Sequence, residues 1–131
     1  MKAAIAAVAA AGLGLAAASA CFSERSSGPA ASLAECRVPV TVIDSLHYLV
    51  AIRGFLYYPD SIAVPTGATV SWVNCEDVGQ EPHTTTSDST GVWDSSDMLP
   101  GARFSHRFTT PGAFPYHCTA HAFMVAKVVV Q

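Results

Sequence analysis

The stretch FPYHCTAHAFMVAKVVV, residues 114–130, carries most of the information about fold and site. An alternating aromatic segment leads into Cys118, and an apolar run occupies residues 127–130. This pattern predicts two strands joined by a short loop. Within that loop Cys118, His121 and Met124 stand three residues apart. Side chains so spaced on one short loop can converge on a single point, so we interpret the loop as half of a metal site.

The rest of the body, residues 36–131, consists of short extended runs separated by turns. The runs occupy residues 38–42, 47–52, 62–64, 70–74 and 104–108, and Pro-Gly turns punctuate them. No amphipathic helical pattern interrupts them. Short strands between Pro/Gly turns are typical of sandwiches and Greek-key barrels. We therefore expect an all-β, Greek-key β-sandwich of about eight strands. The polar triplets within residues 75–100 predict loops and short edge strands.

A second histidine extends the ligand set. His83 follows Pro82 in the polar segment, 35 residues before Cys118. Two imidazoles, one thiolate and a weak axial thioether form the ligand set of mononuclear blue copper sites. Each residue alone is weak support, since a CxxH motif is common and a lone Met is more often a core residue. Together they predict one copper bound by His83, Cys118, His121 and Met124.

Four stretches resemble the cupredoxins, most closely the amicyanin and plastocyanin-like group. They are Pro59-x-x-Ile-x-Val64, GATVSWVN at residues 67–74, Pro82-His83, and residues 114–130. The resemblance covers about residues 47–131. It implies a β-sandwich with type 1 copper at one end, electron transfer through the exposed edge of His121, and supporting roles for Asn74 and Pro82. In particular, it implies that Asn74 ties the two ligand loops together, as outer-shell residues often do.

The sequence departs from that group in two places. The segment between Asn74 and His83 is longer than the short one typical of amicyanins, and Ala120 and Ala122 stand where prolines are frequent. Both changes concern loop geometry and partner recognition, while the ligand set is intact. We expect His121, Ala122 and Phe123 to form the face that transient redox partners contact.

These features predict a small extracytoplasmic electron carrier that cycles between Cu(II) and Cu(I) and is not an enzyme. The alternatives are a copper-binding or buffering module and a subunit of a copper redox enzyme. In copper nitrite reductases a histidine at the place of His117 binds a second copper, but only His47 and His106 remain to complete such a site. We expect a monomer. Without residues 1–20 the chain has 6 basic and 10 acidic residues, which argues against nucleic-acid binding.

The N-terminal segment has the pattern of an export signal. Residues 1–20 combine one basic residue, an apolar run and the small-residue end Ala18-Ser19-Ala20, the order of a cleaved export signal. The expected location is the periplasm or the outer face of the cytoplasmic membrane. Cys21 stands where bacterial lipoproteins carry a lipid, so a lipid anchor and simple cleavage after Ala20 are both open. Residues 21–35, rich in Ser, Ala, Gly and Pro, predict a flexible tether before the copper domain of residues 36–131.

The remaining cysteines also suggest a structural element. Cys118 is assigned to the metal. A free Cys21 would leave one thiol over, whereas a Cys21 that is lipidated or lost drops out of the count. Cys36 and Cys75 are then left over in a compartment where disulfides persist. We expect a bridge between them that pins the N-terminal strand to the sandwich, the alternative being two unpaired thiols.

Overall fold

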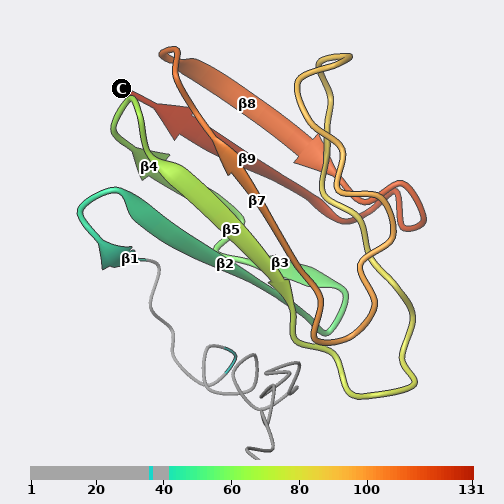
Figure 1. Cartoon of the computed structure of the whole chain (residues 1–131). Coiled ribbons are helices and arrows are strands. Elements are labelled where there is room, and N and C mark those ends of the chain that lie inside the picture. The colour runs from blue at the N-terminus through green and yellow to red at the C-terminus, as the bar shows by residue number, and fades with distance from the viewer. Residues whose placement is uncertain (1–35, 37–41) are drawn as a thin grey trace, which may run out of the picture.

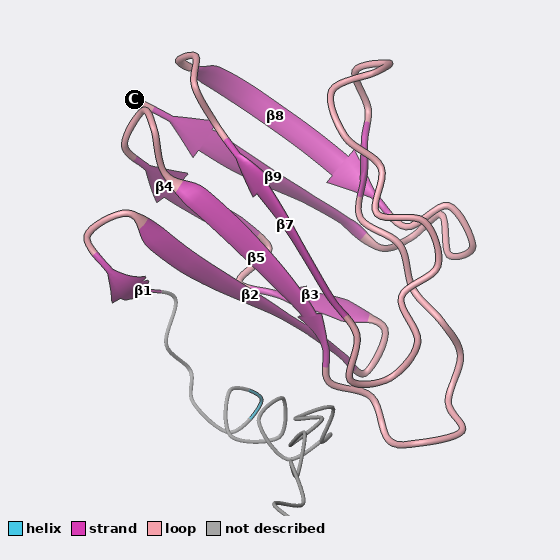
Figure 2. Ribbon diagram, in the orientation of Figure 1, coloured by secondary structure: helices cyan, strands magenta, loops and turns pink. Residues whose placement is uncertain are grey.

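Alternation of apolar and polar side chains builds the strands of this protein. The computed structural model describes Cys36 and residues 42–131, and this part of the chain contains nine strands (Figures 1 and 2). Their bounds are β1 Val42–Asp44, β2 His47–Arg53, β3 Leu56–Tyr58, β4 Ser61–Val64, β5 Thr69–Asn74, β6 Thr86–Ser87, β7 Arg103–Arg107, β8 Gly112–His117 and β9 Val125–Val130.

The strands form two facing sheets. One has the order β1-β2-β5-β7, with β3 also paired to β2, and the other has the order β4-β9-β8-β6. The pairs β2–β5 and β4–β9 are parallel, and the remaining pairs are antiparallel. The chain passes repeatedly from one sheet to the other, and such crossings hold a sandwich together. The predicted all-β sandwich is confirmed.

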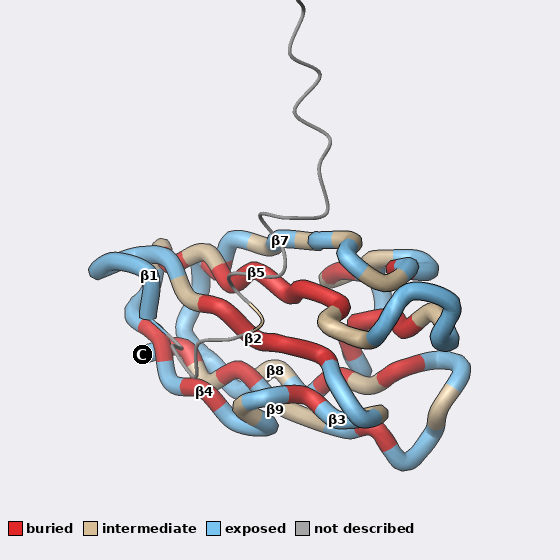
Figure 3. Tube along the Cα trace, turned by 90° about the horizontal axis from the view of Figure 1, so that it is seen from below, coloured by how far each residue is buried: buried red, intermediate tan, exposed pale blue. Residues whose placement is uncertain are grey.

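The core lies between the inner faces of the two sheets. In Figure 3 the buried positions follow β2 and β5 through the middle of the domain. Trp72 of β5 and Tyr116 of β8 come from opposite sheets and pack edge to face with ring centroids 5.5 Å apart. Burial of aromatic side chains supplies much of the apolar area of a small core. The largest fully buried side chains are Trp72, Tyr116, Phe108, Ile52, Met124, His83, Val50, Val64, Val70, Val73, Val128 and Asn74.

The structure contains one strand more than the roughly eight expected, and the two weakest strands were not foreseen individually. β3 follows the turn at Gly54-Phe55, where both residues have positive φ, and β6 is only two residues long. Neither is long enough to show an alternating pattern. Of the expected run 38–42, only Val42 is described; it begins β1, whose three residues are exposed.

One end of the sandwich collects the long connections. The β5–β6, β6–β7 and β8–β9 segments lie at the same end in Figure 1. These segments contain His83, Cys118 and His121. The fold therefore brings the sequence-predicted ligands to one edge of the core.

A disulfide joins Cys36 to Cys75 at this end, with the two Cα atoms 5.5 Å apart. This is the pairing that the cysteine count favoured, and the separation lies within the range that a bridge requires. The predicted export signal, the tether and the lipid site at Cys21 lie outside the described residues. In the part of the chain that is described, no helix is long and apolar enough to cross a membrane.

Candidate metal centre

A tightly wound loop holds the three C-terminal candidate ligands. The loop starts at Cys118 where β8 ends and stops at Met124 before β9. The Cys118 amide donates to the Met124 carbonyl at 3.1 Å, the His121 amide to Cys118 at 3.2 Å, and the Met124 amide to His121 at 2.9 Å. These bonds within seven residues fix where the three side chains leave the backbone.

His83 reaches the same point from the other long segment. Its backbone pairs with Met98 through two hydrogen bonds, of 3.1 and 2.8 Å, and its side chain is fully buried. The candidate ligand atoms of His83, Cys118 and His121 all lie within 4.8 Å of one another. The two Nδ1 atoms are 3.2 Å apart, and the Cys118 Sγ lies 3.5 Å from His121 Nδ1 and 4.0 Å from His83 Nδ1. The fold thus assembles a His-Cys-His cluster.

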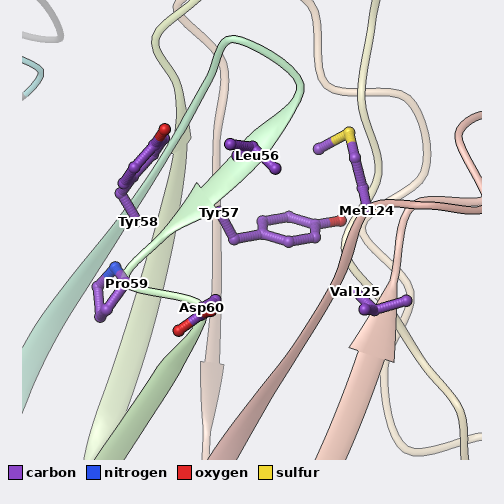
Figure 4. Close-up of a pocket in the computed structure, with 7 residues that line it drawn as sticks. All are labelled: Leu56, Tyr57, Tyr58, Pro59, Asp60, Met124 and Val125. Carbon is purple, nitrogen blue, oxygen red and sulfur yellow. The ribbon is translucent and has the colours of Figure 1, made fainter.

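Met124 belongs to the same loop and is almost completely buried. It lines a pocket of about 320 Å³ together with β3 residues such as Leu56 and Tyr57 (Figure 4). A thioether is a soft and weak donor to copper. The thiol of Cys118 and the two imidazoles form a donor set that fits copper, and Met124 is a candidate fourth donor from the same loop.

A carboxylate that we did not predict holds His83. Glu76 Oε1 lies 3.2 Å from His83 Nε2 and accepts the Phe55 amide at 2.9 Å. Burial acts to raise the pKa of Glu76, but hydrogen bonds from the Phe55 and Gly54 amides and from His83 outweigh it and lower that pKa. Burial also lowers the pKa of His83, and the bond to Glu76 opposes this shift. Glu76 thus fixes the imidazole so that Nδ1 faces Cys118.

The expected role of Asn74 is wrong in one respect. The Asn74 side chain donates to the Met98 carbonyl at 2.7 Å and accepts the Glu76 amide at 3.0 Å, so it braces the His83 side of the cluster only. Both polar atoms of its amide are engaged there, away from residues 118–124. The two ligand loops are joined instead by Thr84, which bonds to Cys118 and Thr119. Pro82 is half-buried directly before His83.

Aromatic and small apolar residues surround the His121 ring. The ring of Phe55 meets those of His83 and His121 edge to face, with centroids 5.2 and 5.0 Å apart. His121 is half-buried, Ala122 is exposed, and Phe123 is 66% exposed. The predicted docking residues are therefore adjacent at the surface, and Phe55 is an apolar neighbour that the sequence did not suggest because it lies in a turn.

The other histidines have partners of their own. His117 Nδ1 lies 2.6 Å from Asp88, and His47 Nδ1 lies 2.7 Å from Asp44. His106 stacks on Trp93 with ring centroids 5.2 Å apart. Among the described residues, the cluster of His83, Cys118 and His121 is the one group of three or more His, Cys, Asp or Glu side chains arranged to hold a metal.

Charge is distributed unevenly over the described residues. Residues 75–101 contain no Lys or Arg but six acidic residues. The four described basic residues all lie in strands: Arg53 in β2, Arg103 and Arg107 in β7, and Lys127 in β9. The loops at the metal end therefore carry most of the negative charge. The six acidic residues are Glu76, Asp77, Glu81, Asp88, Asp94 and Asp97.

A two-sheet sandwich with a buried His-Cys-His cluster at its loop end defines a cupredoxin. Comparison with known proteins agrees. Residues 46–131 match the family described as copper-binding proteins of the plastocyanin/azurin type, and the chain belongs to this family. Copper is the metal of the family, and the donor set fits it.

Individual relatives extend this assignment. The chain is 32% identical to amicyanin of Paracoccus denitrificans over 84 residues, which are 63% of this chain and 64% of that protein. It thus spans less than two thirds of the length of that relative. A purple cupredoxin from Nitrosopumilus maritimus is similar in structure, with a TM-score of 0.57 and 27% identity over 63% of this chain and 98% of that one.

A larger protein shares the same fold in part. A copper-containing nitrite reductase from Thermus scotoductus matches with a TM-score of 0.57 and 29% identity, covering 63% of this chain but 22% of that enzyme. The similarity is therefore to one part of the enzyme chain.

Proposed function

We propose that this protein is a small electron carrier that holds one type 1 copper at His83, Cys118, His121 and Met124. The observation that carries the proposal is the convergence of three donor atoms within 4.8 Å at the loop end of the sandwich. When bound, copper supplies a one-electron couple between Cu(II) and Cu(I). A donor set with both sulfur and imidazole ligands tolerates both oxidation states.

The surrounding residues favour rapid, reversible transfer. Hydrogen bonds within the loop hold Cys118, and Glu76 accepts a hydrogen bond from His83, so little rearrangement should accompany a change of charge at the bound metal. Met124 would supply a weak thioether donor to the copper. His121 reaches the surface between Phe55 and Phe123, and its ring edge is the exit for the electron.

The docking face consists of His121, Ala122 and Phe123, an apolar surface suited to transient protein partners. Replacing the exposed Phe123 by Lys should slow electron exchange with such a partner and leave the visible spectrum unchanged. The Val78→Lys variant is a matched control, because Val78 is 94% exposed and lies in the β5–β6 connection. Equal exchange rates for the two variants would place docking on another surface.

Export is the second part of the proposal. The disulfide between Cys36 and Cys75 suits an oxidising compartment. Together with the signal-like residues 1–20, it supports a location in the periplasm or at the outer face of the membrane. Cys21 is then either lipidated or the first residue after cleavage, and the mass of the mature protein purified from membranes distinguishes these two forms.

The decisive experiment is reconstitution of the purified protein with Cu(II). We expect an intense visible thiolate-to-copper band that Cys118→Ser abolishes, while the apo forms of wild type and variant melt alike. Thr119→Ser is a matched control, because it changes an exposed neighbour and keeps the hydroxyl. A copper-loaded wild type without that band would disprove the type 1 assignment.

Repeated reduction and reoxidation separates a carrier from a copper-buffering module. A carrier keeps its metal through many cycles, whereas a buffer releases it on reduction. An enzymatic role would need a second metal site, and His117, the residue best placed for one, is paired with Asp88. One copper per chain is therefore the expected stoichiometry, and two would favour an enzyme subunit.

A further inference from the structure

The disulfide between Cys36 and Cys75 lies at the start of the β5–β6 connection, one residue before Glu76. The Cys75 amide donates to the Ile52 carbonyl of β2 at 2.7 Å. At the other end of the bridge, the Cys36 carbonyl accepts a hydrogen bond of 3.5 Å from the guanidinium of Arg53, also in β2. Cys75 is therefore attached to β2 twice, once through its own backbone and once through the bridge.

Glu76 connects this attachment to the first candidate ligand. Its Oε1 atom accepts the Phe55 amide at 2.9 Å and lies 3.2 Å from His83 Nε2. The Glu76 amide donates to Asn74 Oδ1 at 3.0 Å. Because a single carboxylate oxygen contacts both Phe55 and His83, a shift of the Cys75 backbone would move that oxygen relative to both partners.

The segment after Glu76 offers little support of its own. Its residues 77–81 are all exposed, and a hydrogen bond of 3.0 Å from the Gln80 amide to the Asp77 carbonyl lies within the segment. A longer connection has more conformational freedom, and a covalent tie at one end reduces it. The position of Glu76 therefore depends mainly on what holds Cys75, the residue before it.

We propose that the Cys36–Cys75 bridge is a positioning element of the copper site, which keeps the Glu76 carboxylate on His83. Without the bridge, Glu76 would spend less time within hydrogen-bond distance of His83. Its negative charge would then lie farther from the copper on average, so the reduction potential should rise. This readout rests on the proposed function, whereas the contact between Glu76 and Phe55 can be tested in the protein without metal.

The paired variant Cys36→Ser with Cys75→Ser removes the bridge and keeps both side chains close to their original size. Val128→Ala is the matched control for a loss of stability. Val128 is fully buried in β9 of the other sheet, so its truncation leaves a cavity in the core and does not touch Glu76.

The first measurement is amide hydrogen exchange of the apo protein, resolved by residue. The Phe108 amide, which donates to the Ala68 carbonyl at 2.8 Å, is the internal reference for general loosening of the fold. Relative to this reference, the Phe55 amide should exchange about tenfold faster in the paired Ser variant, since a net hydrogen bond corresponds to about a factor of ten. The ratio should stay at the wild-type value in Val128→Ala.

The second measurement is the reduction potential of the copper-loaded protein in two backgrounds. Removal of the bridge should raise the potential of the wild type by no more than Glu76→Gln does. In a protein that already carries Glu76→Gln, the same removal should leave the potential nearly unchanged, because the charge that the bridge positions is gone. A bridge that acted only by general stabilisation would have the same effect in both backgrounds.

Wild-type exchange of the Phe55 amide in the absence of the bridge would overturn the proposal, and so would equal potential shifts in the two backgrounds. A wild type that does not bind copper would instead refute the proposed function, and the exchange comparison would still decide the role of the bridge. Should the paired Ser variant not fold, the bridge of the apo wild type is reduced with a phosphine. The Phe55 amide should then exchange faster than before reduction, and an unchanged rate would refute the proposal.

Discussion

The Glu76–His83 contact yields the most direct test of the electrostatics of the site. Glu76→Gln keeps the size of the side chain and one acceptor oxygen but removes its negative charge. The carboxylate oxygen lies 3.2 Å from His83 Nε2, and the side chain of Glu76 is only 11% exposed. A negative charge so close to the site disfavours uptake of an electron, so its removal should raise the reduction potential.

The size of the shift follows from Coulomb's law. The Glu76 carboxylate lies 3.2 Å from His83 Nε2. Adding about 2 Å across the imidazole ring and about 2 Å from the ring to the middle of the ligand cluster gives a separation of roughly 7 Å between the charge and that middle point. At an effective dielectric constant of about 20 this gives about 2 kcal/mol. For a one-electron couple that is roughly 100 mV. Spectroelectrochemical titration of the copper protein measures it directly.

Glu81→Gln is the matched control, because Glu81 lies in the same segment and is exposed. Water screens its charge, so the shift should be several-fold smaller. Glu76→Asp should keep the charge and most of the wild-type potential. A downward shift in Glu76→Gln, or one no larger than that of Glu81→Gln, would refute the reasoning.

Three further predictions concern other parts of the molecule. Met124→Leu should keep copper and colour and raise the potential, because an apolar axial residue favours Cu(I); loss of copper on dialysis would contradict the axial role. Replacing both Cys36 and Cys75 by Ser should lower the unfolding free energy of the apo protein in urea by up to about 4 kcal/mol, the chain-entropy value for the 39-residue separation; an unchanged midpoint would show that the bridge does not stabilise the fold. Burial lowers the pKa of His106 below its ordinary value of 6.5, so the unfolded chain binds the proton more tightly. Below about pH 6.5 the apo wild type should therefore lose stability more steeply than His106→Gln, and parallel profiles would exclude that contribution.

The features that could be predicted are those that depend on residues close together in the sequence. The strands that became β2, β5 and β9 show alternating or continuous apolar patterns, because one or both faces of each are buried. The loop from Cys118 to Met124 could also be recognised, because its spacing predicts converging donors, and Cys118 and His121 do lie in one cluster. Fold class, disulfide pairing and the candidate ligand loop could therefore be predicted without coordinates.

The missed features depend on contacts across long distances in the chain. Glu76 looked like one of several loop acids, and only the folded β2–β3 turn brings the Phe55 amide to it. Thr84 looked like the first of three polar loop residues. Its role depends on the register between β6 and β8, which a two-residue strand cannot reveal. The resemblance assigned the link between loops to Asn74, whose amide is instead used by Met98.

The separation of acidic loops from basic strands has a consequence for how the protein meets others. With six acidic residues and no Lys or Arg in residues 75–101, the metal end is the source of a negative field that reaches beyond the surface. At physiological ionic strength this field extends about 8 Å into solvent. Under the proposed function, this field should orient a partner with a positive surface toward the metal end before the two proteins touch. The rate of electron exchange with such a partner should then fall as salt is raised, even though Phe123 at the proposed contact face is uncharged.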